Sequence, residues 1–401
     1  MDKDPMKPQL AKLRAWWSHK QALDGRLDGA APADVLAETG WARSLGGVGP
    51  YLTLAARAGT SREAVDAAVA SLGIHELPAA RNCTYVVPAA DFALALKAGA
   101  GFSTELKTVM KLGVTEKEIA RLREAVVSAL GKGPLEPDEI REAAGPAVRN
   151  LGEEGKKKGV ATTLPVALNQ LQTEGEIRRV PMDGRLDRQR YRYALWRPNP
   201  LANWKLSSAE VAVELARRYF AWTGPATIGE FQWFSALSLK AAKAAIEPLG
   251  LVPLAPPDDD RLMFPENLEK FASFQVPKQA QYRLVSSIDG ISLLRRDLKS
   301  IVESADIERM VTRERSSGEL TDLPSHAIVD RGKVVGIWEY DPARESIAWL
   351  PFIARNRDLE KAVAGAEEYI RSQLGDARSF SLDSPKSRIP RLEALRKAAG
   401  R

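Results

Sequence analysis

The sequence predicts an α+β fold, in which tandem winged-helix units pack on a C-terminal antiparallel region that resembles a β-barrel. Helical patterns that open with Ser or Thr capping boxes recur through roughly the first 250 residues. An Asp-Gly pair at 183–184 separates two strand-like runs, which indicates a hairpin. From about residue 281, alternating apolar residues and tight turns dominate. We therefore divide the chain into four parts, 1–105, 106–200, 201–262 and 263–401.

The second part gives the clearest winged-helix pattern. Thr115 and Glu118 form a capping box at the start of a helix predicted over 115–130. Further helices are expected at 137–145 and 162–175, and a basic two-stranded hairpin follows them. Three helices followed by such a hairpin are the layout of a winged helix, with the third helix as the recognition helix.

Polar side chains on this third helix and arginines on the hairpin are candidate DNA contacts. Asn169 and Gln170 would face base edges, and the hairpin would lie near phosphates. An ordinary solvated surface is the alternative for each arginine. The hairpin arginines are Arg178, Arg179, Arg185, Arg188 and Arg190.

The first and third parts repeat this architecture without residue-level periodicity. In the third part, capping boxes at Ser207 and Thr227 open two helices, and 238–250 is a third. Beyond residue 281, four strand-like runs predict an antiparallel sheet or half-barrel, followed by a helix at 358–374.

Composition and charge restrict the chemistry. Lys and Arg number 58 against 52 Asp and Glu, so the net charge is +6, which permits nucleic-acid binding without requiring it. One cysteine, Cys83, excludes an internal disulfide and cysteine zinc sites, and three scattered histidines argue against a His-based metal site. No apolar stretch approaches membrane-spanning length and no signal peptide is recognised. We expect a cytoplasmic protein without membrane partner or bound metal.

Five stretches, the last two taken as a pair, together resemble one known family. None is specific alone, but they occur in order over nearly the whole chain: GPYLTLAARAG (49–59), ARNCTYVVPAADF (80–92), ELARRYFAWTGPATIGEFQWFSAL (214–237), and SSIDGISLLRRD (286–297) with DRGKVVGIWEYD (330–341). The set resembles the winged-helix DNA-binding family that includes the AlkZ-like and YcaQ-like DNA glycosylases.

The resemblance implies a monofunctional DNA glycosylase that hydrolyses the N-glycosidic bond of alkylated or bulky bases in duplex DNA. It implies a monomer that needs no cofactor or metal. In a bacterium, such an enzyme would be associated with the nucleoid. The characterised glycosylases carry Gln-x-Gln or Gln-x-Asp ahead of the counterpart of GPYLTL. Counting back from Pro50 without gaps places Thr39-Gly40-Trp41 there, so this chain is a divergent member. The alternative is a non-catalytic winged-helix DNA-binding protein, either a regulator or a damage sensor.

Glycosidic hydrolysis needs a carboxylate or polar pair that stabilises an oxocarbenium-like sugar and positions water. Glu38, next to the displaced motif, is the first candidate for the carboxylate. The alternative is that Glu38 is simply an exposed residue at the end of a helix. Asp289 is the second, because the resemblance places an aspartate at its position, although turn aspartates also cap backbone. Thr39 would hold the water or cap its helix.

Further DNA contacts are predicted around these residues. Trp41 would stack on a base or lie in the core, and Arg43 would contact a phosphate or the solvent. Arg81 and Asn82 precede a buried-looking strand and would face the same channel or serve the fold. The basic segment after Asp289 adds Arg295 and Arg296.

Overall fold

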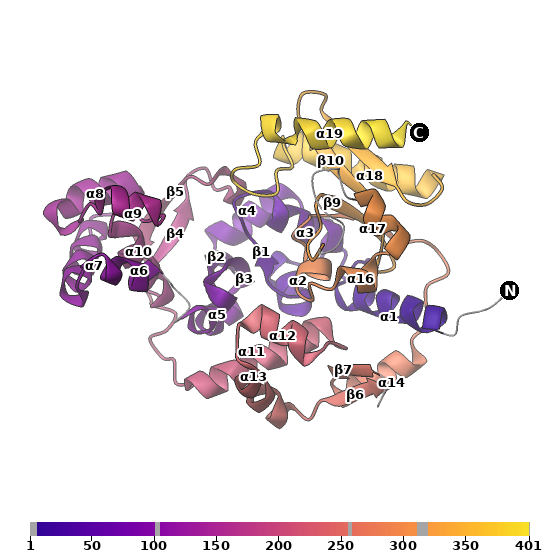
Figure 1. Cartoon of the computed structure of the whole chain (residues 1–401), viewed down its shortest axis with the longest axis horizontal. Helices are drawn as coiled ribbons and strands as arrows, with labels where there is room; N and C mark the ends of the chain where they lie inside the picture. The colour runs from indigo at the N-terminus through magenta and orange to yellow at the C-terminus, as the bar shows by residue number, and fades with distance from the viewer. Residues whose placement is uncertain (1–5, 101–104, 256–258, 311–319, 401) are drawn as a thin grey trace.

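A computed structural model describes residues 6–100, 105–255, 259–310 and 320–400. Helices and strands are mixed along the chain, as the predicted α+β class requires (Figure 1). The part containing α6 to β5 projects to one side of the remainder (Figure 1). Within these ranges, no helix combines the length and the apolar character needed to cross a membrane.

The first part contains a three-stranded antiparallel sheet of order β1-β3-β2, covered by helices. Helix α3 starts at a Gly-Pro pair and ends at Gly59, whose φ of 64° supplies the left-handed C-cap. The elements are α1 (Met6–Lys20), α2 (Pro32–Thr39), β1 (Ala42–Arg43), α3 (Gly49–Ala58), α4 (Arg62–Ala70), β2 (Ile74–Pro78), β3 (Thr84–Pro88) and α5 (Phe92–Gly99).

The second part matches the predicted helices within two residues. Both hydrogen bonds of the predicted Thr115–Glu118 capping box are present. The hairpin differs, because β4 and β5 are joined by residues 182–190 rather than by a two-residue Asp-Gly turn. The elements are α6 (Glu105–Lys111), α7 (Glu116–Leu130), α8 (Pro137–Ala144), α9 (Gly152–Lys157), α10 (Leu164–Thr173), β4 (Ile177–Pro181) and β5 (Tyr191–Leu195).

The third part has the predicted capping boxes at Ser207–Glu210 and Thr227–Glu230. Three helices are again followed by an antiparallel strand pair. The elements are α11 (Ser208–Thr223), α12 (Ile228–Ser235), α13 (Leu239–Ile246), β6 (Val252–Ala255) and β7 (Asp259–Met263).

The C-terminal part contains an open sheet rather than the expected barrel-like one. Its order is β11-β10-β9-β8, all antiparallel. Closing a sheet into a barrel requires tilted, staggered strands whose two edges pair, and β8 and β11 remain separate edges. The strands are β8 (Tyr282–Val285), β9 (His326–Asp330), β10 (Lys333–Asp341) and β11 (Ser346–Pro351).

Helices frame this sheet, and of the described ones only that at 358–374 was predicted from the sequence. The predicted helix at 358–374 is α18 with a π-helical last turn. Helix α19 replaces what the sequence presented only as a basic tail, and it packs on β10 and β11. The helices are α14 (Pro265–Ser273), α15 (Gly290–Leu293), α16 (Leu298–Ile301), α17 (Ser304–Met310), α18 (Arg357–Tyr369) and α19 (Pro385–Ala399).

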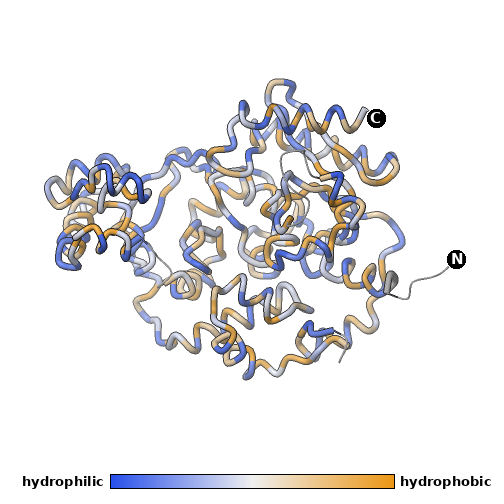
Figure 2. The backbone as a smooth tube through the Cα atoms, in the orientation of Figure 1, coloured by the Kyte–Doolittle hydropathy of each residue, from blue (hydrophilic) through white to orange (hydrophobic). Residues whose placement is uncertain are grey.

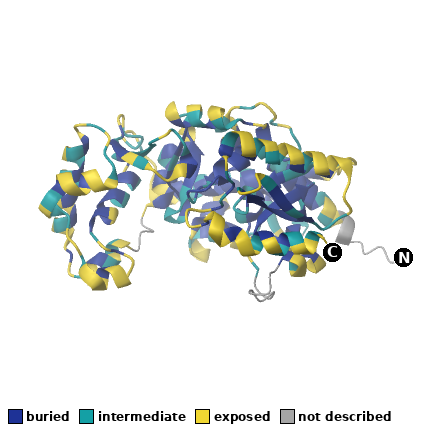
Figure 3. Ribbon diagram, turned by 90° about the horizontal axis from the view of Figure 1, so that it is seen from above, coloured by how far each residue is buried: buried dark blue, intermediate teal, exposed yellow. Residues whose placement is uncertain are grey.

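The apolar cores cross all three predicted part boundaries. One cluster joins Trp41 of the first part to Trp222 and Phe234 of the third. Another joins Val35 to Trp338 of the C-terminal sheet. The second part has a core of its own, built around α7, α8 and α10. Apolar residues recur along most of the chain, and the interior consists mainly of buried residues (Figures 2 and 3).

Candidate active site

A pocket of about 190 Å³ opens where the loop after β1 meets β2 and the β4–β5 hairpin. It therefore lies between the first part and the projecting second part (Figure 1). Its lining residues are Ser44, Leu45, Gly46, Glu76, Thr84, Arg179, Leu186, Gln189 and Tyr191.

A carboxylate, Glu76, lies in this pocket with its side chain 12% exposed. The Ser44 hydroxyl donates a hydrogen bond to Glu76 Oε1 at 2.5 Å. Arg179 Nη1 lies 3.7 Å from Oε2. Because a carboxylate offers about four acceptor positions, these contacts leave some of them open toward the pocket. Such a group can accept a proton from water or stabilise a nearby cation.

The neighbouring histidine, His75, points to the opposite face of β2. It is fully buried beside Phe92 and Trp196, and neither ring nitrogen has a hydrogen-bond partner among the described residues. Burial, assisted by the charges of Arg178 and Arg179, lowers the pKa of His75 to about 3. The imidazole is therefore neutral at neutral pH.

Two glycines shape the loop that forms one wall of the pocket. Gly46 has a φ of 74°, and a Cβ there would lie 1.5 Å from Gln189 Nε2. A Cβ at Gly47 would lie 2.2 Å from the carbonyl oxygen of Arg378. The left-handed φ at Gly46 and the backbone contact at Gly47 therefore favour glycine at both positions.

Residues 376–384, which we call the C-terminal strap, hold both walls of the pocket. Val48 N donates to Arg378 O, and Ser381 N donates to Leu45 O, each at 3.0 Å. The Arg378 guanidinium also donates to the carbonyl of Asp187 on the hairpin connection. The strap thus fixes the loop after β1 and the hairpin relative to each other.

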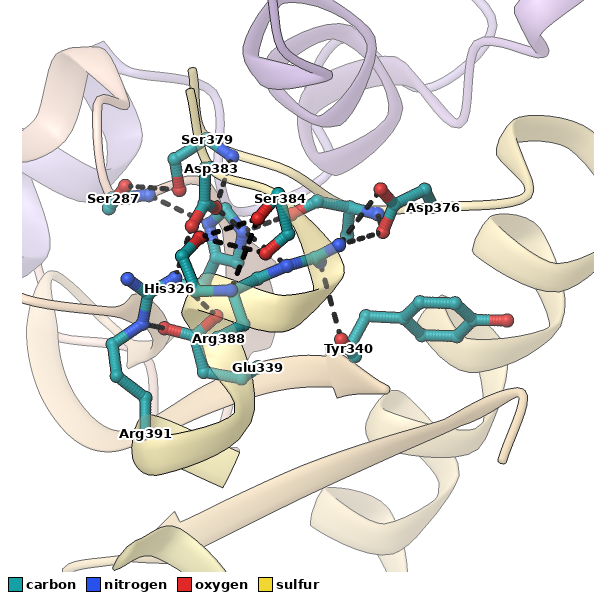
Figure 4. Close-up of polar contacts among 12 residues, drawn as sticks. Ser287, His326, Glu339, Tyr340, Asp376, Ser379, Asp383, Ser384, Arg388 and Arg391 are labelled. Atoms are coloured by element: carbon teal, nitrogen blue, oxygen red, sulfur yellow. Dashed lines mark hydrogen bonds and ion pairs between the residues drawn. The ribbon is translucent and has the colours of Figure 1, made fainter. Parts of the chain in front are cut away.

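A buried polar network anchors the strap to the C-terminal sheet (Figure 4). His326 Nδ1 accepts a hydrogen bond from the Ser287 amide at 3.0 Å, so Nε2 carries the proton and donates to Ala377 O at 2.8 Å. The Ser287 and Ser379 hydroxyls are 3.0 Å apart. Burial lowers the pKa of His326, so this arrangement keeps the ring neutral.

Ion pairs from α19 complete the network (Figure 4). Arg388 pairs with Asp376 at 2.7 Å, and Arg391 pairs with Asp383 at 2.7 Å and with Glu339 at 3.0 Å. Helix α19, which the sequence did not predict, therefore fixes the strap and through it the pocket.

The residues predicted around the displaced motif do not enter the pocket. Glu38 is exposed on α2 and lies 3.6 Å from Arg26. The Thr39 hydroxyl is buried and donates to Val35 O at 2.8 Å, so it caps its own helix. Trp41 is 1% exposed and donates to Asp91, which leaves no face of the indole open to a base.

Asp289 is also outside the pocket, because its carboxylate is completely buried. Arg57 donates to both of its oxygens, at 2.7 and 2.8 Å. The Thr53 hydroxyl and the Ile291 amide donate to it as well, at 3.1 and 3.0 Å. Four donors saturate this carboxylate, and the bond from the Ile291 amide is the backbone capping given above as the alternative for this aspartate.

The hairpin arginines fall into two groups. Arg179 lines the pocket, and Arg185 forms a bidentate pair with Asp187 that leaves it 12% exposed, so it is engaged within the protein. Arg178 is half-buried, whereas Arg188 and Arg190 are exposed, and Arg190 Nη2 lies 4.0 Å from Glu136 Oε2.

The predicted recognition helix, α10, packs against α5 and β2. Gln170 Oε1 is buried without a partner in the described part of the chain, which turns this residue inward. Asn169 instead lines a separate groove of about 400 Å³.

Of the two arginines after Asp289, only one reaches the surface. Arg295 is 3% exposed and lies over Trp17, and burial lowers its pKa to about 10, so it contacts the core rather than DNA. Arg296 is half-buried and lies near Trp233, as does Arg81, whose neighbour Asn82 is also half-buried. Arg43 is half-buried on β1.

Sequence reasoning missed Ser44, Glu76 and Gln189. A signal was present for Glu76, because it is a charged residue within the strand-like run IHELP at 74–78. A carboxylate in such a run needs a polar partner or an opening. Only the three-dimensional structure shows that Glu76 lies at a pocket.

Comparisons with known proteins identify the family of this chain. The family described as DNA glycosylase AlkZ-like matches residues 48–376. The chain belongs to the AlkZ-like DNA glycosylase family. It is accordingly an enzyme of DNA repair, a hydrolase of N-glycosyl bonds, rather than a non-catalytic regulator.

The fold is also similar to a solved structure, that of Streptomyces sahachiroi DNA glycosylase AlkZ. The TM-score is 0.68 at 22% sequence identity, over 92% of this chain and 98% of the other. No curated protein matches the chain significantly.

Proposed function

We propose that this glycosylase removes alkylated or bulky bases from duplex DNA and that the extruded base enters the pocket at Ser44 and Glu76. The observation that carries the proposal is a partly buried carboxylate with open acceptor positions inside a pocket. A base must leave the stack to be cut, and a pocket with an aromatic wall such as Tyr191 suits a flat ligand.

Glu76 would act on the sugar. As the bond between C1′ and the base nitrogen breaks, its electron pair leaves with the base, and the sugar becomes an oxocarbenium-like cation. The Glu76 carboxylate stabilises this positive charge and accepts a proton from the water that attacks C1′. A cationic alkylated base leaves as a neutral molecule, so it needs no general acid. No cofactor or metal takes part in these steps.

The repeated arrangement of three helices and a strand pair supports three winged-helix units along the duplex. In this proposal the exposed Arg188 and Arg190 contact phosphates, and Asn169 faces the groove of the second unit. The enzyme acts as a monomer.

The test measures base release from duplex DNA treated with a methylating agent, detected by alkaline cleavage at the abasic product. We expect release by the wild type and a loss of roughly 100- to 1,000-fold in Glu76→Gln, which is the scale of a lost electrostatic group. Glu38→Gln is the matched control, because that carboxylate is exposed and outside the pocket.

Equal activity of Glu76→Gln and the wild type would refute the role of Glu76. Absence of release from methylated DNA, together with release from a bulkier adduct or a crosslink, would restrict the substrate class while keeping the pocket.

A further inference from the structure

Three arginines, one of them beside the pocket, lie against aromatic rings. The guanidinium carbon of Arg43 is 5.2 Å from the ring centre of Tyr85. Those of Arg81 and Arg296 are 4.5 and 5.1 Å from the ring centre of Trp233. A guanidinium held against a ring loses little further freedom when it binds a ligand. We call these three residues the arginine row.

The row begins at the pocket. Arg43 Nη1 donates to Thr84 O at 2.9 Å, and Thr84 is a lining residue of the pocket. The amide of Ser44, which holds the Glu76 carboxylate through its hydroxyl, donates to the same carbonyl at 3.1 Å. Arg43 therefore flanks the proposed catalytic carboxylate without entering the pocket.

The row continues to α12. Tyr85 lies between Arg43 and α12, with its ring centre 6.2 Å from that of Phe234, the neighbour of Trp233. Burial raises the pKa of the Tyr85 phenol to about 12, and the nearby charges of Arg43 and Arg81 oppose that rise. The Tyr85 ring therefore connects Arg43 to the part of α12 that carries Trp233.

The backbone at the far end is strained. Arg81, Asn82 and Arg296 have φ values of 61°, 55° and 57°, in the left-handed region that non-glycine residues seldom occupy. Strain of this kind persists where the surrounding structure enforces it, and it clusters at ligand-binding sites. Here it places Arg81 and Arg296 beside the same indole.

The charges of two members are not neutralised. Arg296 forms a bidentate pair with Asp322, at 2.9 and 3.1 Å. Among the described residues, Arg43 and Arg81 form no ion pair, and their hydrogen bonds go to backbone carbonyls, that of Arg81 at 3.3 Å. Each guanidinium has five N–H donors, so most remain available to an anionic ligand.

We propose that Arg43 and Arg81 bind two backbone phosphates flanking the nucleotide whose base enters the pocket. Trp233 positions the Arg81 guanidinium, and Arg296 supports the indole through its pair with Asp322. A planar guanidinium matches the oxygens of a phosphate in a bidentate geometry, and duplex DNA supplies phosphates in a regular series. This assignment rests on the proposed function for the identity of the pocket.

The first test measures how the affinity for lesion-free duplex DNA depends on salt. Each neutralised phosphate contributes about 0.9 to the slope of log K against log salt concentration. We expect Arg43→Gln and Arg81→Gln each to reduce the magnitude of the slope by about 0.9. Arg344→Gln, at an exposed arginine in the β10–β11 turn, is the matched control and should leave the slope unchanged.

Trp233 provides a separate readout. Trp233→Leu removes the ring and should reduce the magnitude of the salt slope as much as Arg81→Gln does. Trp233→Phe keeps an aromatic ring, so its salt slope should stay close to that of the wild type. Slopes equal to the wild type in both arginine variants would overturn the proposal, as would a Trp233→Phe variant as weak as Trp233→Leu.

The second test locates the phosphates. A duplex with a stable abasic analogue is made with an uncharged methylphosphonate at one flanking phosphate at a time. Neutralising a bound phosphate should weaken wild-type binding roughly tenfold, the scale of a charge-assisted hydrogen bond. Arg81→Gln should be insensitive to one of these substitutions and Arg43→Gln to the other. Equal sensitivity in all three proteins overturns the assignment.

These binding assays need no catalysis, so the two proposals fail separately. Full base release by Glu76→Gln would refute the role of Glu76 while reduced salt slopes still support the arginine row. Unchanged slopes alongside an inactive Glu76→Gln would refute the row alone.

Discussion

Two carboxylates of this chain, Asp289 and Glu76, occupy contrasting environments. Asp289 is completely buried and accepts hydrogen bonds from Arg57, Thr53 and the Ile291 amide. Glu76 is partly exposed in a pocket and is bonded to Ser44, with a guanidinium at the longer distance of 3.7 Å. A saturated buried carboxylate stabilises the fold, whereas one with open acceptor positions is free to act on a substrate.

The Asp289 site also explains how distant parts are joined. Arg57 Nη2 donates to Gln21 Oε1, and Gln21 Nε2 donates to the carbonyls of Thr39 and Trp222. The network therefore links the turn after α1, helices α2, α3 and α11, and the turn before α15. The hydrogen bonds of these buried polar groups hold the distant parts of the chain together.

The largest expected effect is on stability, in Asp289→Ala. Removing the carboxylate leaves the buried Arg57 guanidinium without a counter-charge, so the free energy of unfolding should fall by about 3–5 kcal/mol. Urea titration followed by circular dichroism measures the loss. The double variant Arg57→Met, Asp289→Leu removes both charges and should regain much of it. A stable but inactive Asp289→Ala would instead restore the catalytic hypothesis for this residue.

His75, next to Glu76 but on the buried face of β2, should make stability depend on pH. Its pKa is about 3 in the folded protein, against about 6.5 when unfolded, so below pH 6.5 the unfolded state binds more protons. This residue should therefore destabilise the fold progressively as the pH falls, by about 2 kcal/mol at pH 5.

His75→Phe should remove that dependence. Unfolding free energies of the wild type and the variant, measured between pH 7.5 and 5, should differ by an amount that changes with pH. Parallel curves would show that His75 is not kept neutral by its burial.

The pocket wall offers a smaller change, Gly46→Ala. The new Cβ would meet the Gln189 side chain and would strain a residue at a φ of 74°, so stability should fall by about 1–2 kcal/mol and base release should decrease. The double variant Gly46→Ala, Gln189→Ala relieves the contact but keeps the backbone strain. It should therefore recover only part of the lost stability and only part of the lost base release. Full recovery would show that the backbone conformation is unimportant here.

The smallest expected stability change is that of Glu76→Gln. Its carboxylate is partly exposed and its guanidinium partner is 3.7 Å away, so the free energy of unfolding should change by less than about 1 kcal/mol. Thermal or urea unfolding of the same protein preparation used for base release checks this. A loss comparable to that of Asp289→Ala would mean that Glu76 also serves the fold, and would weaken the contrast between the two sites.

The local sequence was a good guide to the helices of the second and third parts. Capping boxes at Thr115, Ser207 and Thr227 depend on residues three positions apart, and all three form as predicted. Helix α19 escaped prediction because its basic residues resemble a solvated surface, and two of their carboxylate partners, Glu339 and Asp341, are more than 50 residues away in sequence.

The sequence by itself determined the α+β class, the positions of most helices and strands, and the family. These depend on periodicity, caps and the order of short segments, which are local. Tertiary structure alone decided which carboxylate is saturated and which is open, because Arg57 and Asp289 are 232 residues apart and the walls of the pocket come from three segments of the chain. The burial and pairing of a charged group depend on the neighbours that folding supplies, and no local pattern records them.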